Sequence, residues 1–180
     1  MMRILILISI YLYVMNNTSS QTICAFNERS DLTSWYVVND GVMGGLSSSN
    51  LTFSDDHFGV FEGEVSIENN GGFTMMQHHC NMSNVKNYSK IILKIKGDGK
   101  TYQFRIKDDR GHYYSYVQNF DTSNNKETIE LKLSDFKPAF RGRTLNMSPF
   151  QKDTIEQVAI LIGNKKEERF RLEINEIILK

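Results

Sequence analysis

The sequence carries no surplus of charge of either sign, because 21 Lys and Arg residues balance 21 Asp and Glu residues. A protein that neutralises nucleic-acid phosphates normally has a basic excess, so we expect no nucleic-acid partner. Cysteine and proline are scarce, at two residues each. Two cysteines exclude a scaffold built from several disulfides, although an oxidising compartment would permit Cys24 and Cys80 to pair. The sequence leaves that pairing open.

Long apolar runs are absent except at the beginning of the chain. Arg3 precedes an apolar run over residues 4–14 and a small, polar stretch over residues 16–20, which is the layout of a secretory signal peptide. The run is shorter than a membrane span of about 20 residues, so a retained anchor is the less favoured alternative. We expect residues 1–20 to be a signal peptide and residues 21–180 to form one domain without a transmembrane span. The mature protein is then exported, as a periplasmic or secreted protein.

Amphipathic helical spacing is also missing after the signal segment, and alternation of apolar and polar residues takes its place. Residues 90–107 show this alternation most clearly, with apolar positions at Ile91, Leu93, Ile95, Tyr102, Phe104 and Ile106. Gly97, Asp98 and Gly99 lie between the two halves and have the composition of a tight turn. The pattern therefore predicts a hairpin.

The rest of the chain has the same character. Residues 158–162 are apolar throughout, which predicts a central strand covered on both faces. Residues 135–153 contain both prolines, and we expect an irregular crossing there, either between sheets or over one end of the sandwich. About nine short strands separated by turns indicate an all-β fold, an antiparallel β-sandwich or jelly roll, with a closed barrel as the alternative.

Glycine is concentrated shortly after the single tryptophan, Trp35, at Gly41, Gly44 and Gly45. A phosphate-binding loop aims a helix N-terminus at the anion and places a Lys next to the glycines, and this segment has neither. We expect these three glycines, and the later pair Gly71 and Gly72, to form turns between early strands.

No catalytic motif stands out. Adjacent acids such as Asp55 and Asp56 are typical of solvated turns, and the serines at 47–49 lack the spacing found around a nucleophile. Of the cluster His78, His79 and Cys80, only His78 and Cys80 would share one face of a strand, and two ligands are too few for a zinc site, which needs three or four. We therefore expect no enzyme activity, no metal and no cofactor.

The segment 135–153 sets Arg141 and Arg143 beside Phe140, a combination of cations and aromatic surface that is enriched at binding sites. If this segment and the first glycine segment meet at one end of the sandwich, the candidate binding residues are Trp35, Asn39, Asp40, Met43, Phe140, Arg141 and Arg143. The alternative is structural, with aromatic plugs and arginines paired with acids. For Trp35 we favour a place in the core over direct contact with a ligand.

Several short motifs occur in the order in which one known family has them. They are Asn39-Asp-Gly-Val-Met-Gly-Gly-Leu-Ser-Ser48 after Trp35, Phe61-Glu-Gly63, Asn70-Gly-Gly-Phe73, Gly97-Asp-Gly99-Lys-Thr-Tyr102, Phe140-Arg-Gly-Arg143 and Phe170-Arg-Leu-Glu-Ile174. Through them, essentially all of residues 21–180 resembles the complex I intermediate-associated protein 30 family. The resemblance implies a galactose-binding-like jelly roll without an established catalytic residue set. For mitochondrial members it implies a role in assembling respiratory complex I.

Two departures limit what the resemblance implies about function. The beginning of the chain has the pattern of an export signal rather than an Arg-rich mitochondrial transit peptide. Thr74-Met-Met-Gln77 also follows Phe73, where many members are similar to one another in having small residues, Val and Arg. The chain looks like an exported, bacterial, single-domain member.

Three hypotheses follow. The first is a non-catalytic module that binds a protein partner as an assembly or folding helper, and the second is a carbohydrate-binding module of the cell envelope. A hydrolase is the least favoured. A sugar site built on Trp35 requires an exposed indole, and a hydrolase requires two carboxylates across a cleft.

Overall fold

The computed structural model describes residues 19–27 and 31–180, so most of the predicted signal peptide lies outside the described residues. Five strands form most of the first sheet: β3 (Ser48–Phe53), β4 (Gly59–Val65), β6 (Lys90–Lys96), β9 (Lys126–Lys132) and β13 (Glu168–Leu179). The second sheet contains β2 (Trp35–Asn39), β5 (Thr74–Ser83), β7 (Thr101–Lys107), β8 (Ser115–Asp121), β10 (Lys137–Phe140), β11 (Arg143–Thr144) and β12 (Thr154–Ile162). The helical turns of the described residues are short 3-10 segments.

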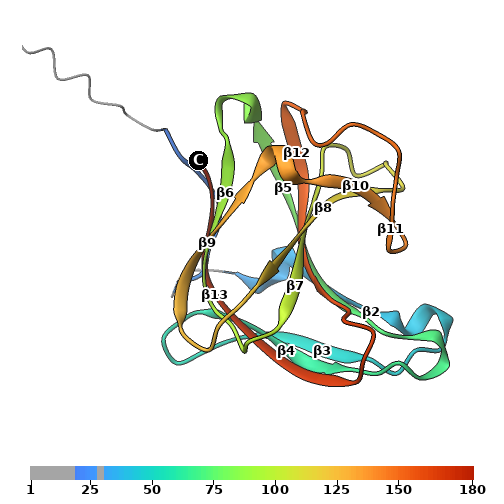
Figure 1. Cartoon of the computed structure of the whole chain (residues 1–180). Helices are drawn as coiled ribbons and strands as arrows, with labels where there is room; N and C mark the ends of the chain where they lie inside the picture. The colour runs from blue at the N-terminus through green and yellow to red at the C-terminus, as the bar shows by residue number, and fades with distance from the viewer. Residues whose placement is uncertain (1–18, 28–30) are drawn as a thin grey trace, which may run out of the picture.

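The two sheets pack face to face as an antiparallel jelly roll (Figure 1). The six-stranded sheet has the order β3-β4-β13-β6-β9, and β1 (Gln21–Ala25) pairs with β13. The seven-stranded sheet has the order β11-β10-β8-β7-β12-β5-β2. The predicted all-β jelly-roll sandwich is therefore confirmed. The pairing of β1 with β13 also joins Gln21 to Leu179, close to the C-terminus.

The predicted hairpin over residues 90–107 is wrong. Both strands exist, but β6 pairs with β9 and β13 in one sheet, whereas β7 pairs with β8 and β12 in the other. The turn between them crosses from sheet to sheet. It is fixed by the Asp98 carboxylate, which accepts hydrogen bonds from Lys100 Nζ at 2.8 Å, Tyr102 OH at 3.0 Å and the Arg171 backbone N–H at 2.9 Å.

The apolar stretch 158–162 lies in β12, a central strand between β7 and β5, as predicted. Alternate side chains, Val158, Ile160 and Ile162, point into the core between the sheets. Ala159 and Leu161 project from the other face and are also buried. No third layer of strands covers that face among the described residues. Ala159 and Leu161 are therefore buried by the side chains and turns around them on the outer face of the sheet.

The segment 135–153 is not an irregular crossing throughout. It contains β10 and β11, which extend the seven-stranded sheet beyond β8. Phe136 and Phe150, at the two ends of this extension, are buried in the core. These anchors hold the turn between β10 and β11 at the edge of the sheet's outer face.

Candidate functional site

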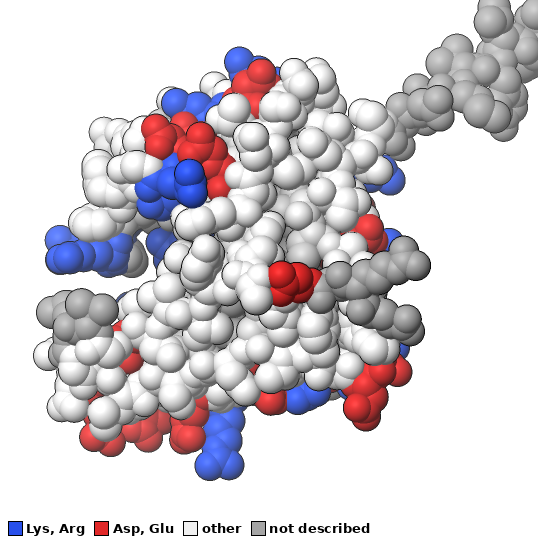
Figure 2. All heavy atoms as spheres, turned by 180° about the vertical axis from the view of Figure 1, so that it is seen from behind, with Lys and Arg blue, Asp and Glu red and all other residues white. Residues whose placement is uncertain are grey.

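A groove lies on the outer face of the seven-stranded sheet. It encloses a hollow of about 470 Å³ and is bounded by parts of β5, β7, β12 and the turn after β10. Its lining residues are Gly72, Phe73, Met75, Gln77, Gln103, Arg105, Lys107, Tyr113, Ser115, Phe140, Arg141, Gly142, Gln157, Ala159, Leu161 and Gly163. In Figure 2 an indentation is visible at the left edge of the molecule, below the basic side chains of the β10–β11 turn.

Strand register places the floor residues in rows across the sheet. Gln77, Ala159 and Arg105 are neighbours on β5, β12 and β7. The Nε2 of Gln157 donates to the Oε1 of Gln77 at 3.2 Å. This hydrogen bond links amide groups on two neighbouring strands. Between Gln77 and Arg105, the small side chain of Ala159 keeps the floor of the groove low.

Arg105 is a partly buried cation on this floor. Its Nη1 donates to the Oε1 of Gln103 at 3.4 Å, and none of the ion pairs among the described residues involves Arg105. Burial lowers the pKa of the guanidinium, since a charged group loses hydration there. Arginine nevertheless stays charged at neutral pH. The floor therefore holds an uncompensated positive charge.

Lys107 adds a second cation along the same strand. Its Nζ donates to the backbone carbonyl oxygens of His112 and Arg110. Burial and the nearby charge of Arg105 lower the pKa of Lys107, while Asp109 acts in the opposite direction. The carbonyl contacts hold this ammonium group in place at the side of the groove.

One rim carries an aromatic pair. Tyr113 and Phe140 meet edge to face with ring centroids 5.1 Å apart, and 64% of Tyr113 and 37% of Phe140 are exposed. The guanidinium carbon of Arg141 lies 5.2 Å from the Phe140 ring centre. Phe140 and Arg141, two of the predicted binding residues, therefore do border one site.

The opposite rim is held in place by Asp40. Its carboxylate accepts hydrogen bonds from the backbone N–H groups of Gly72 at 2.6 Å, Phe73 at 3.3 Å and Ser47 at 3.1 Å, and from the Ser47 hydroxyl. Burial alone would raise the pKa of the Asp40 carboxyl, but these hydrogen bonds outweigh burial and lower it. Asp40 itself is 7% exposed, so it shapes the rim without being available to a ligand.

The glycines around Asp40 allow this close arrangement. A Cβ atom at Gly45 would lie 2.3 Å from Asp40 Oδ1, and one at Gly71 would lie 2.6 Å from Oδ2. Such distances are far inside van der Waals contact, so any larger residue would push the carboxylate away from its donors. The glycine-rich segment thus serves to bury one acid.

Trp35 does not form a platform for a ligand. Its indole is 8% exposed and packs between the rings of Phe26 and His78, at centroid distances of 5.6 Å and 4.9 Å. Contact with a ligand requires an open indole face, so this part of the predicted binding site is wrong. Core packing, the interpretation that we favoured from the sequence, is correct for Trp35.

The remaining predicted residues are scattered. Asn39 Oδ1 accepts a hydrogen bond from Ser49 Oγ at 2.8 Å, which ties β2 to β3. Arg143 is exposed on β11 but is not part of the groove lining. The side chain of Met43 lies outside the described part of the structure. The two predicted loops meet indirectly, because Asp40 positions Gly72 and Phe73 in the lining.

The sequence analysis missed the floor, above all Gln77, Gln103, Arg105 and Gln157. These residues occupy the polar positions of alternating strands, which look identical to an ordinary solvent face. The available signal was the all-apolar stretch of β12, because Ala159 and Leu161 indicated that the second face was covered by something.

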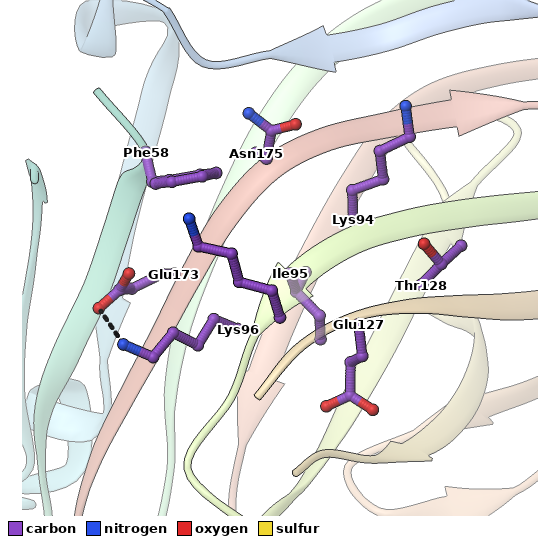
Figure 3. Close-up of a pocket in the computed structure, with 9 residues that line it drawn as sticks. Phe58, Lys94, Ile95, Lys96, Glu127, Thr128, Glu173 and Asn175 are labelled. Carbon is purple, nitrogen blue, oxygen red and sulfur yellow. Dashed lines mark ion pairs between the residues drawn. The ribbon is translucent and has the colours of Figure 1, made fainter. Parts of the chain in front are cut away.

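A second hollow, the Lys94 hollow, lies on the outer face of the six-stranded sheet and encloses about 250 Å³ (Figure 3). Its lining residues are Phe58, Lys94, Ile95, Lys96, Lys126, Glu127, Thr128, Glu173 and Asn175. Here the cations have partners. Lys94 Nζ lies 2.8 Å from Glu176 Oε2, and Lys96 Nζ lies 3.8 Å from Glu173 Oε1.

Among residues 19–27 and 31–180, no three His, Cys, Asp or Glu side chains converge as metal ligands would. Cys24 and Cys80 are free thiols, and burial raises their pKa values to about 11 and about 12. No helix in the described residues has the length and hydropathy of a membrane span.

The architecture is that of a β-sandwich with a ligand-sized groove on one sheet. Comparison with known proteins agrees with the sequence motifs, because the pattern described as "Complex I intermediate-associated protein 30 (CIA30)" matches residues 24–174. The chain belongs to this family.

Two curated relatives are similar in sequence. "Uncharacterized protein C9E9.15" of Schizosaccharomyces pombe is 31% identical over 164 residues, which cover 78% of this chain and 75% of the yeast protein. "Complex I intermediate-associated protein 30, mitochondrial" of Mus musculus is 23% identical over 179 residues. That match covers 87% of this chain but 55% of the mouse protein.

Solved structures with the same fold carry other names. A family 11 carbohydrate-binding module of the cellulase Lic26A-Cel5E from Clostridium thermocellum superposes with a TM-score of 0.65 at 16% identity, covering 89% of this chain and 94% of that one. The same kind of module in complex with a β-1,3-1,4-mixed-linked tetrasaccharide gives 0.62 at 17% identity, covering 86% and 93%. At such identities the likeness shows the fold alone.

Proposed function

We propose that this protein is a non-catalytic module that binds an oligosaccharide chain in the groove of the seven-stranded sheet. The observation that carries the proposal is the pairing of amide side chains on the groove floor with exposed aromatic rings on its rim. Ligand sites are concave, enclose about 300–1,000 Å³, and combine apolar surface with a few placed polar groups. The groove meets each of these criteria.

The chemistry of a sugar suits this lining. Hydroxyl groups both donate and accept hydrogen bonds, and so do the amides of Gln77, Gln103 and Gln157. The exposed rings of Tyr113 and Phe140 offer flat apolar surface to the C–H face of a pyranose. The printed name of one structural neighbour, a carbohydrate-binding module in complex with a tetrasaccharide, supports the proposal by analogy.

The lining also favours binding over hydrolysis. Glycoside cleavage usually needs two carboxyl groups facing each other across the sugar. Among the described residues that line the groove there is no Asp or Glu. A hydrolytic role for the groove would therefore need a mechanism of another kind.

Calorimetry with variants of the lining tests the proposal. Ligands are first selected on a glycan array, and affinities are then measured for Gln157→Ala and Tyr113→Ala. We expect each change to weaken binding by about tenfold, because each removes one direct contact. Thr128→Ala, in the Lys94 hollow, is the matched control and should bind like the unmodified protein. Failure of every glycan to bind, or an equal effect of all three variants, would contradict the proposal.

A protein partner is the second candidate, and membership of the CIA30 family favours it. In this case the groove or its rim contacts a polypeptide during assembly or folding. Crosslinking in the native envelope should then return one reproducible partner, and the yield should fall with Tyr113→Ala but not with Thr128→Ala. Recovery of that partner together with a blank glycan array would place this candidate first.

We further propose that the protein acts after export. The support is the signal-like pattern of residues 1–20, which precedes β1. N-terminal sequencing of protein recovered from the periplasm or medium should find a chain beginning near Gln21. Recovery of an unprocessed chain from the cytoplasm would contradict export.

A further inference from the structure

The groove differs from the rest of the molecule in the sign of its charge. The whole chain is balanced, but three of the residues that line the groove are cations and, within the described lining, none is an acid. The cations are Arg105 on the floor, Lys107 at its side and Arg141 on the rim. A neutral protein thus gathers three cations on one concave surface whose described lining contains no acid.

An adjoining hollow of about 360 Å³ continues the groove toward β10 and β11. It shares Gln103, Arg105 and Gly142 with the groove, and it adds Lys137 and one acid, Asp135. Arg105 lies where the two hollows meet. A ligand several units long that follows the sheet would pass directly over its guanidinium.

The neighbours of Arg105 leave its guanidinium unpaired. On β12 the residue in register with Arg105 is Ala159, and on β8 it is Val117. Neither side chain carries charge, and the contact with Gln103 Oε1 is long at 3.4 Å. A carboxylate that approached from the open side would find planar donors not already used by an acid.

Several cations on the six-stranded sheet are neutralised by ion pairs. On the six-stranded sheet Lys90 pairs with Glu130 at 2.7 Å, Lys94 with Glu176 at 2.8 Å, and Arg171 with Glu173 at 3.1 Å. In each of these pairs a nearby position of the same sheet supplies the acid. Arg105 differs because it is partly buried and has no ion pair among the described residues, and an anionic group on the ligand would neutralise it.

We propose that the ligand of the groove is an acidic oligosaccharide, one whose sugars carry carboxylates as uronic acids do, with Arg105 as the carboxylate-binding residue. This inference rests on the proposed glycan-binding function. The glutamines and rim aromatics contact the hydroxyls and ring faces, while Arg105, assisted by Lys107 and Arg141, selects for charge. An acidic peptide would satisfy the cations, but an acidic chain such as polyglutamate offers no ring face to the exposed rings of Tyr113 and Phe140.

The test compares uronate tetrasaccharides, galacturonate and mannuronate, with their methyl esters by calorimetry at neutral pH. Esterification removes the charge and keeps the sugar backbone. We expect the acid form to bind at least about tenfold more tightly, and to lose affinity as salt is added. Equal affinity for acid and ester would overturn this inference and leave the proposed function standing.

The decisive variant is Gln103→Glu, which nearly preserves the size of the side chain and gives Arg105 an internal carboxylate partner. It should bring the ratio of acid to ester affinity close to one, and this ratio is the readout because loss of the Gln103 amide weakens the binding of both forms alike. Thr128→Glu, which places the same added charge in the Lys94 hollow, is the control and should keep the preference. An unchanged preference in Gln103→Glu would overturn the role of Arg105.

Two further outcomes separate the hypotheses. Lack of binding to the acids, the esters and a neutral glucan tetrasaccharide would overturn both the inference and the proposed function. Hexaglutamate peptide that binds as tightly as the uronates, and is lost in Gln103→Glu, would show that the groove recognises acidity in a peptide and would overturn the assignment to a sugar.

Discussion

The groove and the Lys94 hollow are both lined by lysine or arginine but differ in how that charge is neutralised. In the Lys94 hollow, Lys96 pairs with Glu173 (Figure 3). Lys94 pairs with Glu176, and Lys126 Nζ lies 4.9 Å from the centre of the Phe58 ring. In the groove, Arg105 has only an amide neighbour. A lining rich in lysine and arginine therefore indicates a ligand only where no carboxylate of the protein itself pairs with those cations.

The core between the sheets should matter to both hollows equally. Trp35→Ala removes an indole packed between Phe26 and His78, and we expect it to lower the free energy of unfolding by about 3–5 kcal/mol. Urea denaturation measures this loss. The folded fraction should still bind glycan with unchanged affinity. A selective loss of affinity in folded protein would mean that Trp35 belongs to the groove after all.

The rim of the groove depends on one buried acid, and the Lys94 hollow has no counterpart. Asp40→Ala should lower the free energy of unfolding by about 2–3 kcal/mol, because it strands the N–H groups of Gly72, Phe73 and Ser47. Asp55→Ala, at an exposed acid in a turn, is the control and should change stability by less than about 0.5 kcal/mol.

The pH dependence of Asp40 has a definite sign. Its pKa is lower in the folded state than the unfolded value of about 3.9, so its contribution is fully present above that value. The contribution is lost as the pH falls through the folded pKa. The stability gap between the unmodified protein and Asp40→Asn should therefore be widest at neutral pH and shrink in acid. A gap independent of pH between 7 and 2 would show that the charge of Asp40 is not what holds the rim.

The unpaired cation of the groove should cost stability, unlike the paired cations of the Lys94 hollow. Arg105→Gln removes a partly buried charge without a partner and should raise the free energy of unfolding by about 1 kcal/mol. Lys94→Gln breaks a surface ion pair and should lower it by less than about 1 kcal/mol. Urea denaturation should therefore show changes of opposite sign in the free energy of unfolding for the two variants. A loss of stability in Arg105→Gln would contradict the idea that Arg105 is an unpaired cation.

The smallest effect concerns the turn that borders the groove. Arg141 has a φ of 47°, a left-handed conformation that asparagine adopts more readily than arginine. Arg141→Asn should raise the free energy of unfolding by about 0.5 kcal/mol while it weakens binding of the uronates. Arg143→Asn removes the same charge outside the lining and should do neither. If Arg141→Asn and Arg143→Asn changed stability and uronate binding equally, Arg141 would have no specific role in the groove.

Alternation along the chain predicted strands well and their partners poorly. The apolar positions of β6 and β7 were correct, yet these strands belong to different sheets because their hydrogen-bond partners lie far away in sequence. Turn composition at Gly97 and Gly99 cannot distinguish a hairpin from a crossing. Register between distant strands is decided by burial in the core, which no local pattern records.

The candidate site was harder to predict than the fold for the same reason. Gln103, Arg105 and Lys107 occupy the polar phase of β7 and look like any solvated strand face. The turn between β10 and β11 forms one wall over that face and makes it a groove. This turn belongs to the segment 135–153, whose prolines had predicted an irregular structure without strands. Trp35 and Asp40, which stood out most in the sequence, have structural roles: Trp35 packs in the core and Asp40 holds the rim of the groove.

The pairing of β1 with β13 determines on which side of the sandwich these two strands lie relative to the groove. Both lie in the six-stranded sheet, so Gln21 and Leu179 are paired neighbours on the layer opposite the groove. A bead or neighbouring domain joined to the chain beside Gln21 or Leu179 would therefore be attached to the sheet that does not carry the groove.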